Sequence, residues 1–236
     1  MKASFKDQLK TVSADQNIEE LLDIFLDNSK SFPTIEEMNV MVDEHFHQWV
    51  EKNKTSSKVY SRKSKLRIEK HLFNIHLKDR KTHIIFKAKV LKKTLGIQWV
   101  SLHYVSTPKG LLYFHLIPRN KTVICYYSHF FDRYATRALD ENFKNRTNSI
   151  NGYFLDLLGN DFIQIYNTNN KEIKICVEEG LVLGSFNMMK RGNEIGRFIV
   201  CNTFISKEML RVDQLSMWKD ARAKKLKLEE PYFIIY

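Results

Sequence analysis

Residues 83–127 read HIIFKAKVLKKTLGIQWVSLHYVSTPKGLLYFHLIPRNKTVICYY, and this stretch decides the fold class. It consists of short runs rich in Ile, Val, Phe and Tyr, separated by the turn-forming segments KKTLG, STPKG and PRNK. Such runs between turn signals are typical of β-strands, and connections this short favour antiparallel pairing. The stretch therefore predicts an antiparallel meander.

Similar runs return later in the chain, in FIQIYNT, EIKICVE, GLVLGSF and RFIVCNTFI, and predict further strands. The sequence leaves open whether the two sets of strands form one sheet or two. Helical periodicity lies before, between and after them, and the predicted helices lie near residues 15–26, 35–52, 128–143, 149–158 and 206–222. Ser206 is the expected N-cap of the last one. The second opens with a capping box formed by Thr34 and Glu37.

The fold class is therefore α+β, with N-terminal helices followed by a mostly antiparallel sheet and two or three inserted or flanking helices. We expect a helical N-terminal region with a basic linker over residues 1–81, and an α+β domain over residues 82–236. Within the first region, residues 52–65 are polar and serine-rich, which predicts the linker. Residues 66–77 are interpreted as a short basic helix.

The composition indicates a basic globular protein. Its 236 residues include 38 Lys and Arg against 27 Asp and Glu, a formal net charge of +11. With 43% hydrophobic residues the chain can bury a core, and only 8 Gly and 4 Pro exclude collagen-like and linker-dominated classes. No apolar run reaches the roughly 20 residues that span a bilayer, and no signal peptide is visible. We therefore expect a cytoplasmic protein with no membrane partner and with its three cysteines reduced.

The positive charge is concentrated in residues 52–93, where 15 Lys and Arg stand against 2 Asp and Glu, a net charge of +13. Residues 1–51 hold 4 basic and 11 acidic residues, a net charge of −7. A basic block can bind a polyanion, because Lys and Arg neutralise phosphates and release condensed counterions. The alternative is a solvated segment that complements the acidic N-terminal helices. The residues that we predict to contact nucleic acid, RNA rather than DNA, are Lys58, Arg62, Lys63, Lys65, Arg67 and Lys70.

The most informative segment for chemistry begins at Tyr127 and reads YSHFFDRYATR. On a helix capped by Ser128, His129, Arg133 and Arg137 are spaced four residues apart and form one polar stripe. A histidine in the first turn meets the positive end of the helix dipole, which favours a neutral imidazole able to accept a proton. The two guanidinium groups can bind a phosphate through forked hydrogen bonds. Such a set suits RNA cleavage without a metal, in which the 2′-hydroxyl attacks its own phosphodiester.

The alternative interpretation of this segment is a surface helix whose histidine has no role and whose arginines form ion pairs. The acidic residues available for those pairs are Asp132, Asp140 and Glu141. Without geometry, the sequence does not decide between the two interpretations.

Two histidines of the predicted meander form a weaker candidate. If the STPKG loop pairs Val105 with Leu111, strand alternation puts His103, Tyr113 and His115 on one face of the sheet. They could line a site or hold a metal. No Cys or carboxylate lies nearby at ligand spacing, so partly exposed strand positions are the preferred interpretation.

The stripe and its surroundings resemble a known grouping of enzymes. Ser-His with Arg four and eight residues on, then a second helix, strands and a last strand carrying hydroxyl residues, is similar to the pattern of the metal-independent ribonucleases that group barnase, EndoU, the tRNA-cleaving colicins and RelE-type toxins. The resemblance covers about residues 123–206. The roles that it implies are His129 as the base, Arg133 and Arg137 as phosphate contacts, and Thr203 and Ser206 as site hydroxyls. The chain departs from the pattern in carrying a further meander and an N-terminal helical region.

We therefore expect an RNA-directed protein, with a metal-independent endoribonuclease of toxin or defence type as the leading hypothesis. An antitoxin or regulatory protein is the expected protein partner. Two alternatives stay open: a non-catalytic nucleic-acid-binding or phage-encoded interaction protein, and an assembly protein whose basic block meets the acidic helices of a neighbouring copy. No metal and no cofactor is predicted, because the chain has no glycine-rich phosphate loop, nucleotide-binding fingerprint or metalloprotease motif.

Overall fold

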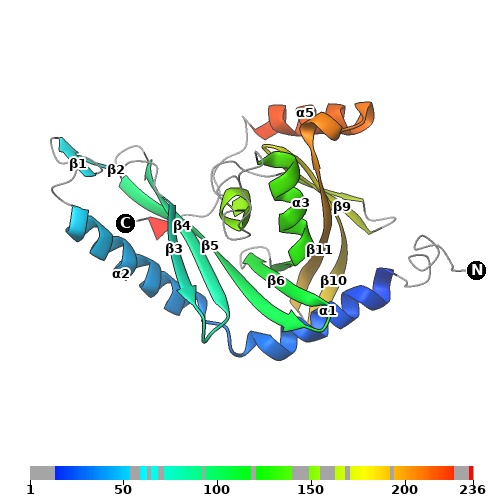
Figure 1. Ribbon diagram of the computed structural model, residues 1–236, viewed down its shortest axis with the longest axis horizontal. Helices are drawn as coiled ribbons and strands as arrows, with labels where there is room; N and C mark the ends of the chain where they lie inside the picture. The colour runs from blue at the N-terminus through cyan, green and yellow to red at the C-terminus, as the bar shows by residue number, and fades with distance from the viewer. Residues whose placement is uncertain are drawn as a thin grey trace, which may run out of the picture.

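The computed structural model describes residues 14–53, 59–62, 65–68, 72–91, 94–117, 121–139, 149–154, 163–167, 171–191, 194–225 and 234–235. These residues form a long sheet with helices on both of its faces, and a separate two-stranded hairpin (Figure 1). Within this part of the chain, no helix is long and apolar enough to cross a membrane. The α+β class is as predicted.

The sheet has ten strands and unites the two predicted sets of strands. Its first half is the meander from β3 to β7, its second half is the meander from β8 to β11, and β12 pairs with β5. The halves meet where β7 and β11 run parallel, while the other neighbouring strands are antiparallel. The strands of the sheet are β3 (Leu72–Leu77), β4 (Thr82–Leu91), β5 (Thr94–Thr107), β6 (Gly110–Ile117), β7 (Thr122–Tyr127), β8 (Ile163–Asn167), β9 (Glu172–Val177), β10 (Gly180–Arg191), β11 (Glu194–Ser206) and β12 (Ile234–Ile235).

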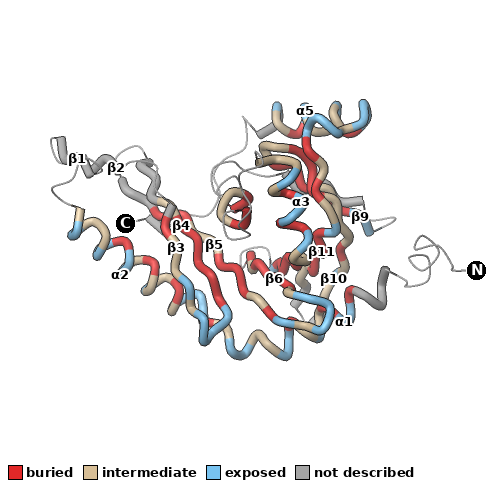
Figure 2. The backbone as a smooth tube through the Cα atoms, viewed as in Figure 1, coloured by how far each residue is buried: buried red, intermediate tan, exposed pale blue. Residues whose placement is uncertain are grey.

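Helices cover both faces of the sheet, and buried residues follow the strands and the inner sides of the helices (Figure 2). The helices are α1 (Ala14–Ser29), α2 (Ile35–Asn53), α3 (Ser128–Ala138), a short helix at residues 149–154, the 3-10 turn η3 (Lys207–Met209) and α5 (Val212–Lys225). α1 and α2 pack on one face, and α3 and the 149–154 helix pack on the other. α5 packs against β9 and β10 through Ala221.

The core beneath α3 is built from aromatic rings. Phe130, Phe131 and Tyr134 are buried on α3 and pack with Tyr153 of the 149–154 helix and Tyr126 of β7. The rings of Tyr126 and Tyr153 meet edge to face at 5.6 Å, a favoured arrangement for aromatic pairs. This cluster fixes α3 on the sheet and so orients the side of the helix that faces away from it.

α1 and α2 pack through separate apolar clusters on the opposite face. Phe25 of α1 lies 5.3 Å from Phe114 of β6, and Phe46 of α2 lies 5.8 Å from Phe73 of β3. α2 begins with the predicted capping box, in which the Glu37 carboxylate accepts from the Thr34 N–H at 2.8 Å and the Thr34 hydroxyl accepts from the Glu37 N–H at 3.2 Å. The capping-box prediction is confirmed.

The prediction of a basic helix at residues 66–77 is wrong. Residues 65–68 form β2, which pairs with β1 (Val59–Arg62) in the two-stranded hairpin, and residues 72–77 form β3 at the edge of the main sheet. The hairpin occupies part of the predicted linker at residues 52–65. β3 alternates Phe73, Ile75 and Leu77 toward α2, and this period of two is the signature of a half-buried strand.

The expected boundary between residues 81 and 82 falls in the turn of the β3–β4 hairpin. α2 shares one apolar cluster with β3, β4 and β5, so residues on both sides of this boundary contribute to the same core. The last helix also begins later than expected. Ser206 precedes the 3-10 turn without a side-chain cap, and α5 starts at Val212.

Candidate functional site

α3 follows β7 directly, and its first residues lie beside β11 because β7 and β11 are parallel neighbours. Ser128 does not cap the helix as predicted. The N-cap position is Tyr127, which has extended backbone angles and no side-chain cap hydrogen bond. The helix is held instead by its buried aromatic residues, and the hydroxyl of Ser149 donates to the backbone carbonyl of Phe131.

The amphipathic pattern of α3 is the predicted one. Phe130, Phe131 and Tyr134 are buried, whereas His129 and Arg133 are exposed. Residues four apart on a helix have Cβ atoms about 5–6 Å apart. His129 and Arg133 therefore lie next to one another on the solvent side of the helix.

The structure brings both predicted arginines to the end of β11. The Arg133 Nη1 donates to the Thr203 Oγ1 at 2.9 Å, and Arg137 donates through its Nη1 to the backbone carbonyl of Phe204. Each guanidinium carries five N–H donors, and each of these two contacts uses one of them. The contact between Arg133 and Thr203 unites two predicted site residues that are 70 positions apart in the sequence.

A β-bulge places Thr203 where Arg133 can reach it. Cys201 pairs with Gly184 and Thr203 pairs with Leu183, so Asn202 is an extra residue on β11. Bulges re-aim the side chains that follow them and are frequent next to functional sites. The backbone passes so close at this point that a Cβ on Gly184 would lie 2.2 Å from the carbonyl oxygen of Val200.

His129 lies against an aromatic ring. Its imidazole stacks on the ring of Tyr127 with centroids 5.4 Å apart and an interplanar angle of 16°. Ser206, by contrast, is buried and pairs with Gly180 at the start of β10. No hydrogen bond among the described residues connects Ser206 to α3. The structure therefore separates the five predicted site residues. His129, Arg133, Arg137 and Thr203 lie on or beside α3, whereas Ser206 is buried where β11 pairs with the start of β10.

The alternative interpretation of α3 as an ordinary surface helix expects ion pairs between its arginines and Asp132, Asp140 or Glu141. Asp140 and Glu141 lie outside the described residues, and Asp132 is exposed on α3. In the described part of the chain, neither Arg133 nor Arg137 forms an ion pair. Their described polar partners are the Thr203 hydroxyl and a backbone carbonyl of β11.

Three of the six predicted nucleic-acid contacts, Arg62, Lys65 and Arg67, lie on the β1–β2 hairpin. Arg62 pairs with Lys65, and Arg67 pairs with Tyr60. The other three predicted residues, Lys58, Lys63 and Lys70, lie outside the described residues.

The predicted register of the STPKG hairpin is wrong by one residue. Val105 pairs with Leu112, and His103 pairs with Phe114. A shift by one residue moves a side chain to the other face of a sheet. His103 therefore faces α1 and α2, whereas His115 faces the α3 side, where its ring meets that of Phe154. The two histidines cannot share a site.

Both of these histidines are buried, rather than partly exposed as expected. Burial lowers the pKa of His103 to about 3 and that of His115 to about 4. Across the described residues, no group of three or more His, Cys, Asp or Glu side chains is placed to hold a metal ion.

Two groups in these contacts were missed by sequence reasoning. The Phe204 carbonyl that accepts from Arg137 is a backbone group, for which no sequence signal exists. Thr82, whose hydroxyl lies 2.9 Å from the Nδ1 of His103, becomes its neighbour through the pairing of β4 with β5. Only the strand register could have identified Thr82.

Comparison of the chain with known protein families, with curated proteins and with solved structures finds no significant match.

Proposed function

We propose that the exposed side of α3 and the end of β11 form a binding site for an RNA phosphodiester, and that the chain is an RNA-directed protein that cleaves RNA without a metal. The observation that carries this proposal is the hydrogen bond from Arg133 to Thr203 beside the exposed His129. Anchoring the guanidinium to β11 reduces the number of side-chain conformations that it would lose on binding a phosphate.

Each group has a role in the proposed chemistry. His129 accepts the proton of the RNA 2′-hydroxyl, and the resulting oxyanion attacks the adjacent phosphorus. The bond from phosphorus to the 5′-oxygen breaks, which leaves a 2′,3′-cyclic phosphate. The leaving oxygen takes a proton from water, and the hydroxide that remains takes the proton from His129, which regenerates the base. Arg133 and Arg137 stabilise the additional negative charge on the phosphoryl oxygens.

The net charge of +11 supports a polyanionic ligand, since summed positive charge attracts nucleic acid over long distances. Under the proposal, the β1–β2 hairpin extends the contact along the RNA backbone through the predicted basic residues. The toxin or defence role, and an antitoxin or regulatory protein partner, stay predictions of the sequence.

A non-catalytic RNA-binding protein is the second candidate, and the stacked rings of Tyr127 and His129 favour it. Aromatic and imidazole rings at a protein surface form platforms on which unpaired bases stack. Under this candidate His129 contacts a base, and the arginines hold the backbone without cleavage.

The test compares RNA binding and cleavage by the full chain and three variants, with total tRNA and a single-stranded RNA as substrates in EDTA. His129→Gln is expected to retain binding and abolish cleavage, whereas Arg133→Gln is expected to weaken both. The matched control is Arg211→Gln, which removes an exposed arginine paired with Asp213 in a different part of the surface.

Binding is measured by fluorescence anisotropy at several salt concentrations. In Arg133→Gln the magnitude of the slope of log affinity against log salt should decrease by about one, because one phosphate contact is lost. If Arg133→Gln binds and cleaves as Arg211→Gln does, the proposed site is wrong. If the wild-type chain binds RNA without cleaving it, the second candidate is correct.

A further inference from the structure

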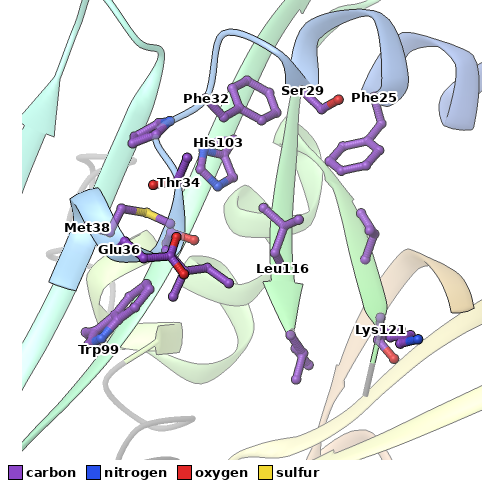
Figure 3. Close-up of a pocket in the computed structure, with 16 residues that line it drawn as sticks. Phe25, Ser29, Phe32, Thr34, Glu36, Met38, Trp99, His103, Leu116 and Lys121 are labelled. Atoms are coloured by element: carbon purple, nitrogen blue, oxygen red, sulfur yellow. The ribbon is translucent and has the colours of Figure 1, made fainter. Parts of the chain in front are cut away.

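A pocket of about 490 Å³ lies between the connection of α1 to α2 and the face of the sheet opposite α3. The principal side chains of its lining are Phe25, Phe32, Met38, Trp99, His103 and Leu116 (Figure 3). Ligand pockets of proteins commonly enclose about 300–1,000 Å³ and have mainly apolar walls with a few polar groups. This pocket has that size and that kind of lining.

The pocket exists because the two helices on this face pack through separate clusters. α1 packs on β6, β7 and β11, and α2 packs on β3, β4 and β5. Between the helices the chain passes through Pro33, which cannot continue a helix from α1. The strand residues beneath the gap include the small polar residues Ser101 and Thr122, which fill less space than the rings on either side.

His103 is one of the polar residues of the lining, which also include Ser29, Thr34, Glu36, Ser101, Lys121 and Thr122. Its side chain is 0% exposed, and its ring stacks on Phe32 with centroids 4.3 Å apart and an interplanar angle of 12°. Figure 3 shows the imidazole beneath the Phe32 ring, among side chains from both helices and the sheet. The Nε2 of His103 is buried and has no hydrogen-bond partner among the described residues.

A chain of hydrogen bonds defines which nitrogen of His103 carries the proton. The Thr82 hydroxyl donates to the carbonyl of Arg80 at 2.7 Å, so its single hydrogen is not available to His103. The Nδ1 of His103, 2.9 Å from the same hydroxyl oxygen, must therefore be the donor. Burial lowers the pKa of His103 to about 3, so the ring is neutral at ordinary pH and its Nε2 carries a lone pair.

We propose that this pocket binds a small, uncharged, flat molecule that donates a hydrogen bond to the Nε2 of His103. A buried acceptor without a partner is rare in proteins, and a hydroxyl or N–H donor would satisfy it. The rings of Phe25, Phe32 and Trp99 suit an aromatic body. The Nε2 is shielded from solvent, so the ligand reaches it when side chains of the lining move apart.

The chemical class is therefore a phenol-like or indole-like compound, with one donor on a fused or single ring. An acceptor-only compound of the same shape would leave two acceptors facing one another. A charged compound would lose its hydration in a largely apolar site. The pocket lies on the opposite face of the sheet from α3, and this inference does not depend on the proposed RNA chemistry.

The test uses the full chain and two probes, 2-naphthol and 2-methoxynaphthalene, titrated by calorimetry at pH 7.5. The two compounds share one ring system, and only the first can donate a hydrogen bond. We expect 2-naphthol to bind about tenfold more tightly, as one recovered hydrogen bond implies. In His103→Phe, which retains a ring against Phe32, this preference should disappear.

The control variant is His115→Phe, which replaces a buried histidine that faces the α3 side of the sheet. One nitrogen of His115 also has no partner in the described part of the chain. This variant should retain the preference for 2-naphthol.

A measurement on the wild-type chain covers the case in which His103→Phe fails to fold. The ¹⁵N resonance of the His103 Nε2 should move upfield with 2-naphthol and much less with 2-methoxynaphthalene. Absence of 2-naphthol binding, or an unmoved Nε2 resonance, would overturn the proposal.

Discussion

Lowering the pH from 7.5 to 5.0 is expected to destabilise the protein through three buried histidines. His83, His103 and His115 are 4%, 0% and 5% exposed. Burial is the main cause that lowers their pKa values from 6.5, to about 3 for the first two and about 4 for the third. For His83, the neighbouring His76, whose ring centroid is 3.8 Å away, lowers the pKa further.

The sign follows from the proton count of the two states. Below pH 6.5 the unfolded chain protonates these histidines while the folded chain keeps them neutral, so the unfolded state binds more protons. The stability is fully present above pH 6.5 and is lost as the pH falls toward the folded pKa values. At pH 5.0 each histidine contributes a loss of about 2 kcal/mol, and the three together about 6 kcal/mol. That loss is comparable with the whole free energy of unfolding of a typical domain, about 5–15 kcal/mol.

The assay is urea unfolding followed by circular dichroism, at intervals between pH 7.5 and 5.0. Near pH 5 the free energy of unfolding should change with a slope that corresponds to about three protons. His115→Phe should reduce that slope by one proton. Ile85→Val is the control, because it removes one methyl group from the same core, costs about 1 kcal/mol and leaves proton uptake unchanged. A total change below about 2 kcal/mol across this range would refute the reasoning, since the folded protein would then bind the protons itself.

Three further outcomes follow from individual contacts. Gly184→Ala should destabilise the chain by about 3 kcal/mol or more in the same urea assay, because the new methyl group would lie 2.2 Å from the backbone oxygen of Val200; a loss below 1 kcal/mol would contradict the close approach. Thr34→Ala should cost about 1 kcal/mol through the loss of its cap on the Glu37 N–H, and Thr34→Ser should restore most of it. The three cysteines should resist iodoacetamide in the folded chain and react in urea, because they are buried and burial raises the pKa even of Cys176, to about 11; rapid labelling of the folded chain would show that a thiol is accessible.

The parts of the fold that the sequence predicted depend on local patterns. The capping box of Thr34 and Glu37 lies within one helical turn, and the buried positions Phe130, Phe131 and Tyr134 follow from the period of one helix. In both cases the interacting groups are a few residues apart in the sequence. No knowledge of the strand order was needed to identify them.

Register and short strands were harder to predict, for a physical reason. The STPKG hairpin closes with two turn residues and with Gly110 at a φ of +118°, which pairs Val105 with Leu112 instead of Leu111. Both registers satisfy the composition of the loop, yet they place His103 on different faces of the sheet. At β3, the alternation of apolar residues is too brief to exclude a helix without knowledge of β4 beside it.

The site around α3 depends on a pairing that no local pattern encodes. A parallel pair of strands needs a long crossover, and the one between β7 and β11 includes α3, the 149–154 helix and the strands β8 to β10. Arg133 reaches Thr203 only because this crossover returns β11 to the side of β7 and because the bulge at Asn202 follows it. Thr203 and Ser206 entered the prediction together, through the same resemblance, and the strand geometry separates them. The hydroxyl one residue after the bulge faces the arginine, whereas Ser206, three residues further, is buried opposite Gly180.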